Sequence, residues 1–303
     1  MRVGVSLRSA YGDLEPRQSA GWMVERARAA REASLDSLFV GDRHISGESY
    51  FQNSPMLGRL LAEWGDAPAG ALYLLPLWHP VVVAEQVATL AAIARGRFIL
   101  QCALGDGTEQ FAGVGVDTRR RVPRFEEGLG IVRRLLAGET VSSDGEWSIE
   151  RARIGMTPDE PIAVWVGGAV PAALDRAARL GDAWVAGPYA PPNALTGQVA
   201  VYREACGRHG RRPAVMAIRR DIHVGRDDAD ARRVADPVIA AGYRGLDPDV
   251  LIVGGPERVA EEFRRLSALG FTDVIIRHLA DDQNEVLASF ERLAAVRREV
   301  VED

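Results

Sequence analysis

The sequence contains no lysine: all 37 of its basic residues are arginine, set against 42 acidic residues and a formal net charge of −5. Without a lysine amine the chain cannot form a Schiff base with a carbonyl substrate, which disfavours an aldolase. The acidic balance, with no stripe of cations along one face, lacks the electrostatic footprint of a nucleic-acid-binding protein. We therefore expect no nucleic-acid partner.

Cysteine and long apolar runs are also scarce. Cys102 and Cys206 lie far apart with no CxxC motif, so neither a disulfide framework nor a thiolate metal site is indicated. No HExxH motif or cluster of histidines and carboxylates at ligand spacing is present, and we predict no metal. No apolar run approaches ~18 residues, and the N-terminus has no signal-peptide core. We expect a cytoplasmic protein without membrane contact.

What the chain does contain is an alternation of short apolar runs with segments of helical period. Eight runs read as strands: 2–7, 37–42, 70–75, 97–104, 162–168, 182–187, 214–222 and 272–278. Helices are predicted between them, for example at 16–33, 80–94, 121–138, 171–181 and 255–270. Several of these open with proline and close with glycine, as helix starts and stops do.

Eight such units, apolar on both faces of each strand, favour an α/β fold with a parallel sheet covered by helices. No GxGxxG motif opens the first helix, which lowers the case for a doubly wound dinucleotide fold. We predict a (β/α)8 TIM barrel that forms a single domain over residues 1–303. Two insertions interrupt it, a β-hairpin at 140–156 after the fourth strand and a polar, Asp-rich segment at 223–250 after the seventh.

The second strand runs directly into Asp42, Arg43 and His44. In a TIM barrel the carboxyl ends of the strands form the active-site rim, so these three ionisable side chains are predicted to lie there. Histidine exchanges a proton near neutral pH, and Asp42 would fix its tautomer. The structural alternative is that Asp42 caps a turn and Arg43 pairs with it.

Other strand ends carry a sparse polar set: Ser6, Arg8, Glu109, Arg219, Arg220, Asp221, Arg277 and His278. Gly167 and Gly168, just before a helix that begins near Pro171, form a candidate anion-binding nest, although ordinary turn geometry explains the pair equally well. Most of the remaining rim is apolar or glycine. This suits a flat hydrophobic ring with a phosphate tail better than a sugar or a metal.

Five stretches now carry a family resemblance: "SLFVGDRH", "LPLWHPVVVAEQVATLAAIARGRFILQCALGDG", "RVPRFEEGLGIVRRLLAGE", "PIAVWVGGAVPAALDRAARLGDAW" and "LGFTDVIIR". Together they resemble the bacterial luciferase-like superfamily of flavin and deazaflavin enzymes. The resemblance implies a TIM barrel that binds reduced FMN or coenzyme F-420 at the strand ends, with the phosphate near the fifth strand. It also implies a non-prolyl cis peptide bond, which falls between Ala71 and Leu72, and a homodimer.

The resemblance assigns roles to individual residues. It implies that His44 and Glu109 flank the reacting carbon of the cofactor ring, with Asp42 beside them. The family's motif is Asp-His, and here Arg43 intervenes, so His44 is displaced by one residue. The alternative is that His44 only packs beside the cofactor ring. The implied cofactor contacts are Ser6, Asp42, Ala71, Leu72, Tyr73, Ala103, Leu104, Gly105, Gly167 and Gly168. The predicted substrate or lid residues are Arg43, Gln52, Asn53, Trp78, Arg220 and Arg277. Asn53 and Ser54 before Pro55 are equally the signature of a helix start.

The predicted function is an oxidoreductase that uses a diffusible reduced flavin-type cofactor and a small organic substrate. Hydride transfer with coenzyme F-420 is favoured slightly, because an anionic oligoglutamate tail suits arginines such as Arg43, Arg219, Arg220 and Arg277. The alternative is an FMNH2-dependent monooxygenase that uses O2, with a separate reductase supplying the reduced cofactor. A third possibility is a flavin-binding protein without turnover.

Overall fold

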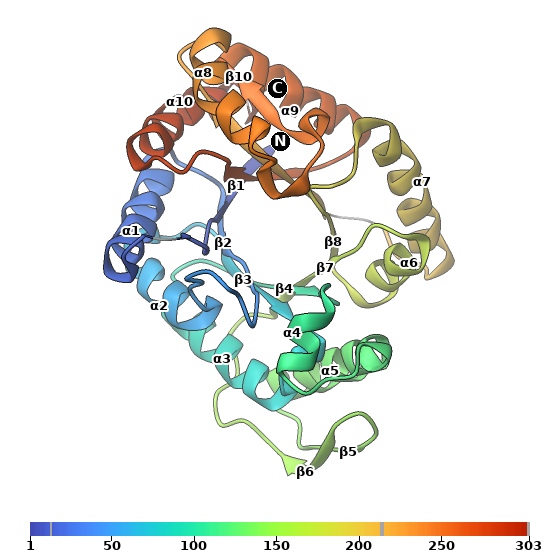
Figure 1. Ribbon diagram of the computed structural model, residues 1–303. Helices are drawn as coiled ribbons and strands as arrows, with labels where there is room; N and C mark the ends of the chain where they lie inside the picture. Colours follow the sequence, from blue (N-terminus) through green and yellow to red (C-terminus); the bar gives the residue numbers. More distant parts are fainter. Residues whose placement is uncertain (13, 213–214, 302–303) are drawn as a thin grey trace.

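Eight parallel strands form a closed barrel at the centre of the protein (Figure 1). The computed structural model describes residues 1–12, 14–212 and 215–301. The barrel strands are β1 Arg2–Leu7, β2 Ser37–Val40, β3 Ala69–Leu74, β4 Phe98–Ala103, β7 Ala163–Gly167, β8 Ala183–Ala186, β9 Val215–Val224 and β11 Asp273–His278. Pairing runs in this order around the ring, and β11 returns to β1. The predicted TIM barrel is confirmed, with each strand within two residues of its predicted bounds.

Helices surround the barrel and cover the outer faces of its strands (Figure 1). They are α1 Pro16–Glu32, α2 Asn53–Trp64, α3 Pro80–Ile93, α5 Arg121–Leu136, α6 Pro171–Leu180, α7 Pro192–Arg208, α9 Pro256–Leu269 and α10 Gln283–Val301. Five of them begin with proline in the first turn, where its missing N–H costs no helical hydrogen bond. None of the helices in the described ranges is long and apolar enough to cross a membrane.

Both predicted insertions are present. Strands β5 Val141–Asp144 and β6 Ser148–Ala152 form an antiparallel hairpin that lies outside the ring next to α5 (Figure 1). The second insertion is more regular than its composition indicates, because it contains the helix α8 Asp228–Ala240. After it, β10 Ile252–Gly254 pairs with the last residues of β9 beyond the barrel. Short elements complete the loops: α4 Thr108–Gly113, η1 Leu75–Leu77, η2 Thr118–Arg120, η3 Tyr243–Gly245 and η4 Pro248–Val250.

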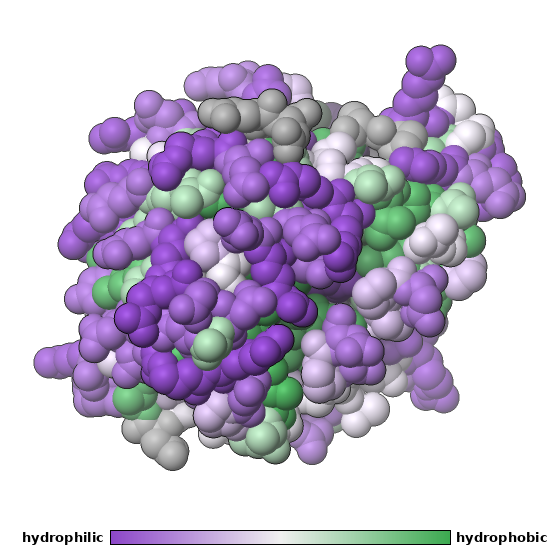
Figure 2. Space-filling view, turned by 90° about the horizontal axis from the view of Figure 1, so that it is seen from above, coloured by the Kyte–Doolittle hydropathy of each residue, from purple (hydrophilic) through white to green (hydrophobic). Residues whose placement is uncertain are grey.

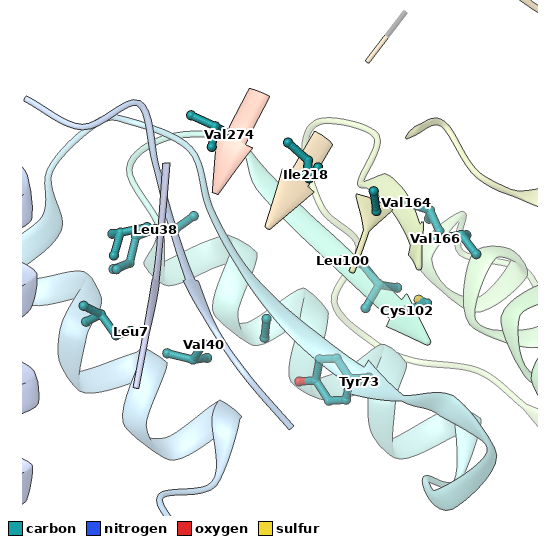
Figure 3. Close-up of a cluster of buried hydrophobic side chains, with 14 of the residues drawn as sticks. Leu7, Leu38, Val40, Tyr73, Leu100, Cys102, Val164, Val166, Ile218 and Val274 are labelled. Atoms are coloured by element: carbon teal, nitrogen blue, oxygen red, sulfur yellow. The ribbon is translucent and has the colours of Figure 1, made fainter. Parts of the chain in front are cut away.

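Strand side chains alternate between two separate cores, as the period of two requires. The outward-facing set packs against the helices, and the residues of it that are labelled in Figure 3 are Leu7, Leu38, Val40, Tyr73, Leu100, Cys102, Val164, Val166, Ile218 and Val274. A smaller cluster fills the barrel interior and consists of Phe39, Ile99, Trp165, Ala183, Ala217 and Ile275. The outer surface is polar by contrast: the face seen in Figure 2 is mostly hydrophilic, with hydrophobic residues in limited areas.

The expected cis peptide bond is not found. All peptide bonds among the described residues are trans, including the one between Ala71 and Leu72. The reason is visible in the pairing of β3, where the whole strand Ala69–Leu74 stays in unbroken parallel register with Phe98–Ala103. A regular extended strand accommodates both residues without a local bulge.

Candidate active site

At the carboxyl end of β2, the chain turns so that Asp42 points inward and Arg43 points into solvent. The side chain of Asp42 is fully buried. Its Oδ2 accepts hydrogen bonds from the backbone N–H of Leu74, at 2.8 Å, and from the indole N–H of Trp78, at 2.7 Å. Because Leu74 ends β3 and Trp78 lies in the loop after it, Asp42 ties the ends of two neighbouring barrel strands together.

His44 reaches the same carboxylate despite its displacement by one residue. Its Nε2 lies 3.4 Å from Oδ1 of Asp42, and its ring meets the Trp78 ring edge-on at 5.1 Å. Trp78 in turn packs against Tyr73 at 5.4 Å. The His44 side chain is 17% exposed, so a small molecule at the mouth of the barrel has access to it. The structure therefore brings His44, Asp42 and Trp78 together.

The backbone around His44 is fixed from a second loop. The side-chain oxygen of Gln110, in α4, accepts a hydrogen bond from the His44 backbone N–H at 3.3 Å. Glu109 lies one residue away in the same helix, but its side chain is exposed on the rim. Gln52 donates to the backbone carbonyl of Arg43 at 3.2 Å. Gln52 and Gln110 thus hold the loop that carries His44.

Several residues predicted to contact the cofactor or substrate instead bond to or pack against other parts of the protein. Asn53 is buried and donates to the carbonyl of Leu72 at 2.7 Å, which docks the start of α2 on β3. Tyr73 faces the helices, where its hydroxyl meets Ser54, and burial raises the pKa of its phenol. Ala71 also lies in the outer core. Of the three predicted β3 contacts, only Leu72 faces the barrel interior.

On the other side of β1 from β2, the ends of β9 and β11 carry a cluster of cations, and Arg277 of this cluster lies beside Gly41. Asp221 is fully buried and accepts a bidentate pair of hydrogen bonds from Arg219, at 3.0 and 3.2 Å. Arg244 and the hydroxyl of Tyr243, both from η3, bond to the same carboxylate at 3.1 and 2.8 Å. Although burial opposes it, the neighbouring arginines hold the pKa of Asp221 below its usual range.

Arg277 is the member of this cluster whose positive charge has no carboxylate partner among the described residues. It donates to the Oγ and the backbone oxygen of Ser6, at 2.9 and 3.3 Å, and pairs with no carboxylate in the described ranges. Burial, together with the like charges of Arg219 and Arg244, lowers the pKa of Arg277 to about 10. Arg219 and Arg244 thus share the Asp221 carboxylate while Arg277 bonds only to Ser6, so these four groups together have an excess of positive charge.

Arg220 belongs to a different environment from its neighbours. It is 2% exposed and donates to the carbonyl oxygens of Pro188 and Ala190, so it supports the loop after β8. The predicted nest at Gly167 and Gly168 lies at the end of β7, just before α6. Neither glycine has a positive φ, and the Gly168 N–H donates to the Val185 carbonyl at 3.4 Å. The pair is thus an extended turn rather than a formed nest.

Three buried polar atoms at the mouth have no hydrogen-bond partner: Asp42 Oδ1, His44 Nε2 and the side-chain nitrogen of Gln101. Gln101 pairs in register with Leu72 and Trp165 and faces the barrel interior with them. Asp42 Oδ1 and His44 Nε2 lie 3.4 Å from each other, whereas the Gln101 nitrogen has no such neighbour. Because buried polar groups in proteins are normally paired, the Gln101 nitrogen suits contact with a bound molecule. Ala103, Leu104 and Gly105, all partly exposed, border the same opening at the end of β4.

Sequence reasoning placed Asp221 on the rim but did not single out Gln101, Gln110, Tyr243 or Arg244 as site residues. A signal existed for one of these four, because Gln101 is a polar residue inside an apolar strand. Arg244 and Tyr243 lie in the second insertion, whose folding back over the mouth no local pattern reveals.

The fold is that of a TIM barrel, and the candidate active site lies on the carboxyl rim of its strands. The family model described as luciferase-like monooxygenase matches residues 1–249 of the 303. The chain therefore belongs to the luciferase-like monooxygenase family, and the predicted resemblance is confirmed.

Similar proteins fall into two cofactor groups. A relative from Nakamurella multipartita, named F420-dependent glucose-6-phosphate dehydrogenase, is 25% identical in an alignment that covers 88% of this chain and 89% of the relative. Among solved structures, an F420-dependent secondary alcohol dehydrogenase in complex with an F420-acetone adduct is 18% identical, with a TM-score of 0.79 and 99% coverage of both chains. The oxygenating constituent of 3,6-diketocamphane monooxygenase from Pseudomonas putida, in complex with FMN, is also 18% identical, with a TM-score of 0.84 and coverage of 100% and 99%. The relatives and neighbours are thus flavin- or F420-dependent oxidoreductases.

Proposed function

We propose that the protein is an oxidoreductase that transfers a hydride between coenzyme F-420 and a carbon atom of a small organic substrate. The observation that carries this proposal is the group formed by His44, Asp42 and Trp78, which places a histidine at the mouth of the barrel beside a buried carboxylate. The name of the Nakamurella relative supports F-420 as the cofactor.

The residues at the mouth fit such a cofactor. Leu72, Ala103 and Gly167 present small or apolar surfaces to a flat ring, and the unpaired nitrogen of Gln101 offers it a hydrogen-bond donor. A Cβ added at Gly167 would stand 3.6 Å from the Cβ of Ala103, so a larger residue there would narrow the opening. When bound, F-420 supplies a ring carbon that gives or takes a hydride.

His44 is proposed to move the proton that accompanies hydride transfer. Oxidation of an alcohol to a carbonyl releases one proton from the hydroxyl group, and reduction consumes one. A neutral imidazole accepts that proton, and the Asp42 carboxylate beside Nε2 stabilises the imidazolium that forms. The second predicted group, Glu109, lies on the rim within the same loop as Gln110 and remains a candidate.

The cation cluster favours F-420 over FMN. FMN carries one phosphate, whereas F-420 carries a phosphodiester and a tail of carboxylates. In the part of the chain that the structure describes, Arg219 and Arg244 pair with Asp221 and Arg277 pairs with no carboxylate, and all three arginines keep part of their side chains accessible. An anion bound there would make charge-assisted hydrogen bonds and offset the repulsion between the arginines.

The alternative is an FMNH2-dependent monooxygenase, which the FMN complex of the Pseudomonas neighbour favours. In that case the barrel would shield an oxygenated flavin from water, and a separate reductase would supply FMNH2. A third candidate is a flavin-binding protein without turnover. All three share the barrel, so the choice depends on which cofactor binds and what it does when bound.

Anaerobic titration of the purified protein with FMN, FMNH2, F-420 and reduced F-420, followed by fluorescence, tests the proposal. We expect F-420 to bind more tightly than FMN, and candidate alcohols or carbonyls to change its redox state in the bound form. Preference for FMNH2 with oxygen uptake would establish the monooxygenase instead. Binding of F-420 without turnover of any acceptor would favour the non-catalytic candidate.

Arg277→Met, compared with the exposed Arg17→Met as control, tests the assignment of the cation cluster. We expect Arg277→Met to weaken F-420 binding by about tenfold, as the loss of one charged hydrogen bond implies, and Arg17→Met to leave it unchanged. If the Kd for F-420 is unchanged but the KM for the substrate rises, the cation cluster binds an anionic group of the substrate and not of the cofactor.

We also propose that the protein is a cytoplasmic homodimer. Sedimentation of the purified chain tests the dimer, and a single species of about 33 kDa would refute it.

A further inference from the structure

The β5–β6 hairpin lies outside the barrel ring (Figure 1), yet its one tryptophan is buried. Trp147 is 6% exposed and packs on α5, where a Cβ on Gly128 would come within 3.2 Å of the indole nitrogen. The guanidinium carbon of Arg124, also in α5, stands 3.8 Å above the indole ring. The Trp147 indole N–H donates to the backbone oxygen of Arg124 at 3.2 Å. Arg124 and Trp147 therefore hold each other in place.

The hairpin is fastened to α5 by a second residue. The carboxylate of Glu127 accepts hydrogen bonds from the backbone N–H of Glu146 at 2.7 Å, from the hydroxyl of Ser143 at 2.5 Å and, more weakly, from the backbone N–H of Trp147 at 3.4 Å. Although burial opposes it, these hydrogen bonds hold the pKa of Glu127 below its usual range. The hairpin is thus a fixed element at neutral pH.

Arg124 connects this element to the active-site loop. Its Nε donates to the carbonyl of Pro76 at 3.0 Å, within η1, and Trp78 follows η1 directly as its C-terminal cap. The same loop touches the hairpin at a second point, because the His79 ring meets the Trp147 ring edge-on at 5.5 Å. The residues on either side of Trp78 are therefore anchored by α5 and the hairpin.

We propose that Arg124, held in place by Trp147, is a positioning residue for the active site. It fixes the Pro76–His79 segment, so that the Trp78 indole N–H stays bonded to Asp42 and the Asp42 carboxylate stays oriented towards His44. The hairpin thereby helps to hold the Pro76–His79 segment, and with it the site, in position. The catalytic consequence rests on the function proposed above, whereas the effect on Trp78 does not.

The chemistry of Arg124 suits this role. In the described part of the chain it pairs with no carboxylate, and its hydrogen bonds go to the carbonyl oxygens of Pro76 and Glu146. A planar guanidinium stacks on an aromatic ring and donates in its own plane at the same time, which an ammonium group does not do. The side chain is thus shaped to join a ring on one element to a backbone oxygen on another.

The test uses Arg124→Met, which keeps the length of the side chain and removes the guanidinium, with Arg134→Met on the same helix as control. Arg134 pairs with Glu139 on the surface, away from η1. The first readout needs no cofactor: it is the indole N–H signal of Trp78 in nitrogen-15 NMR spectra, assigned with Trp78→Phe. We expect its hydrogen exchange to rise about tenfold in Arg124→Met, as loss of about one hydrogen bond implies, and to stay unchanged in Arg134→Met.

The second readout is steady-state kinetics with the cofactor that the titration identifies. We expect Arg124→Met to lower kcat and alter the dependence of kcat on pH, with a smaller change in KM. An indole signal that is unchanged while the unfolding midpoint falls would overturn the proposal, because Arg124 would then only stabilise the fold. If Arg124→Met does not fold, Trp147→Leu carries the same test. A failure of all cofactors to bind would refute the proposed function and leave the NMR result standing.

Discussion

The buried carboxylate of Asp42 allows a quantitative prediction about stability. Asp42→Leu removes the acceptor of two buried N–H groups, those of Leu74 and Trp78. Each unpaired buried donor costs about 1–3 kcal/mol, so the variant should lose about 2–6 kcal/mol of unfolding free energy. Asp42→Asn keeps a carbonyl oxygen for both donors and should lose only about 1 kcal/mol, because the hydrogen bonds become neutral.

Urea unfolding at pH 7.5, followed by circular dichroism, measures both variants. The matched control is Asp106, an exposed aspartate on the same rim, whose replacement by Asn or Leu should change the unfolding free energy by no more than about 0.5 kcal/mol. If Asp42→Leu and Asp42→Asn were equally stable, the two N–H groups would have other partners, and the link from β2 to the loop after β3 would be refuted.

Two further predictions concern stability. His223 and His278 are buried with ring nitrogens unpaired, and burial lowers the pKa of both. Because each ring has a lower pKa in the folded state, its contribution to the free energy of unfolding is fully present above the unfolded-state pKa of ~6.5. Below that pH the unfolded state binds the proton more readily, and the free energy of unfolding falls by up to about 1.4 kcal/mol per pH unit for each ring. Tm measured from pH 7.5 to 5.5 should fall, and less so in His278→Gln; equal slopes would refute this. Gly4→Ala should destabilise, because its Cβ would lie 2.1 Å from Ser37 Oγ, whereas Gly130→Ala in an open part of α5 should stabilise by about 0.5–1 kcal/mol.

The barrel could be predicted because its signals are local and repeated. Each strand is an apolar run, and most helices start with proline. The segment 223–250 was the exception, since it was expected to be a polar insertion yet contains α8. Its start signals were present, as Asp227 caps the helix and the first turn is acidic. Pro237 inside the helix and its polar surface obscured them.

The site was predictable only in part, because its geometry depends on which face of a strand a residue occupies. Strand alternation places Leu72 inward and Ala71 and Tyr73 outward, so a run of consecutive residues cannot all contact one ligand through side chains. The same alternation separates Arg219, which faces the mouth, from Arg220, which faces the loop after β8. The sequence pattern divides the residues of a strand between two faces. Which face points into the barrel is known only once the strand is placed in the structure.

The displacement of His44 shows where local reasoning ends. Strand β2 stops at Val40, so one additional residue after Asp42 shifts no ladder pairing and changes only the path of the loop. That path is set by Gln52 and Gln110, which come from two other segments and bind the backbone of Arg43 and His44. The position of the histidine is therefore determined by side chains 9 and 66 residues away along the chain. It follows that the family's Asp-His spacing is one solution among several, because a rim loop held by such contacts brings a histidine to the same carboxylate from a different position in the sequence.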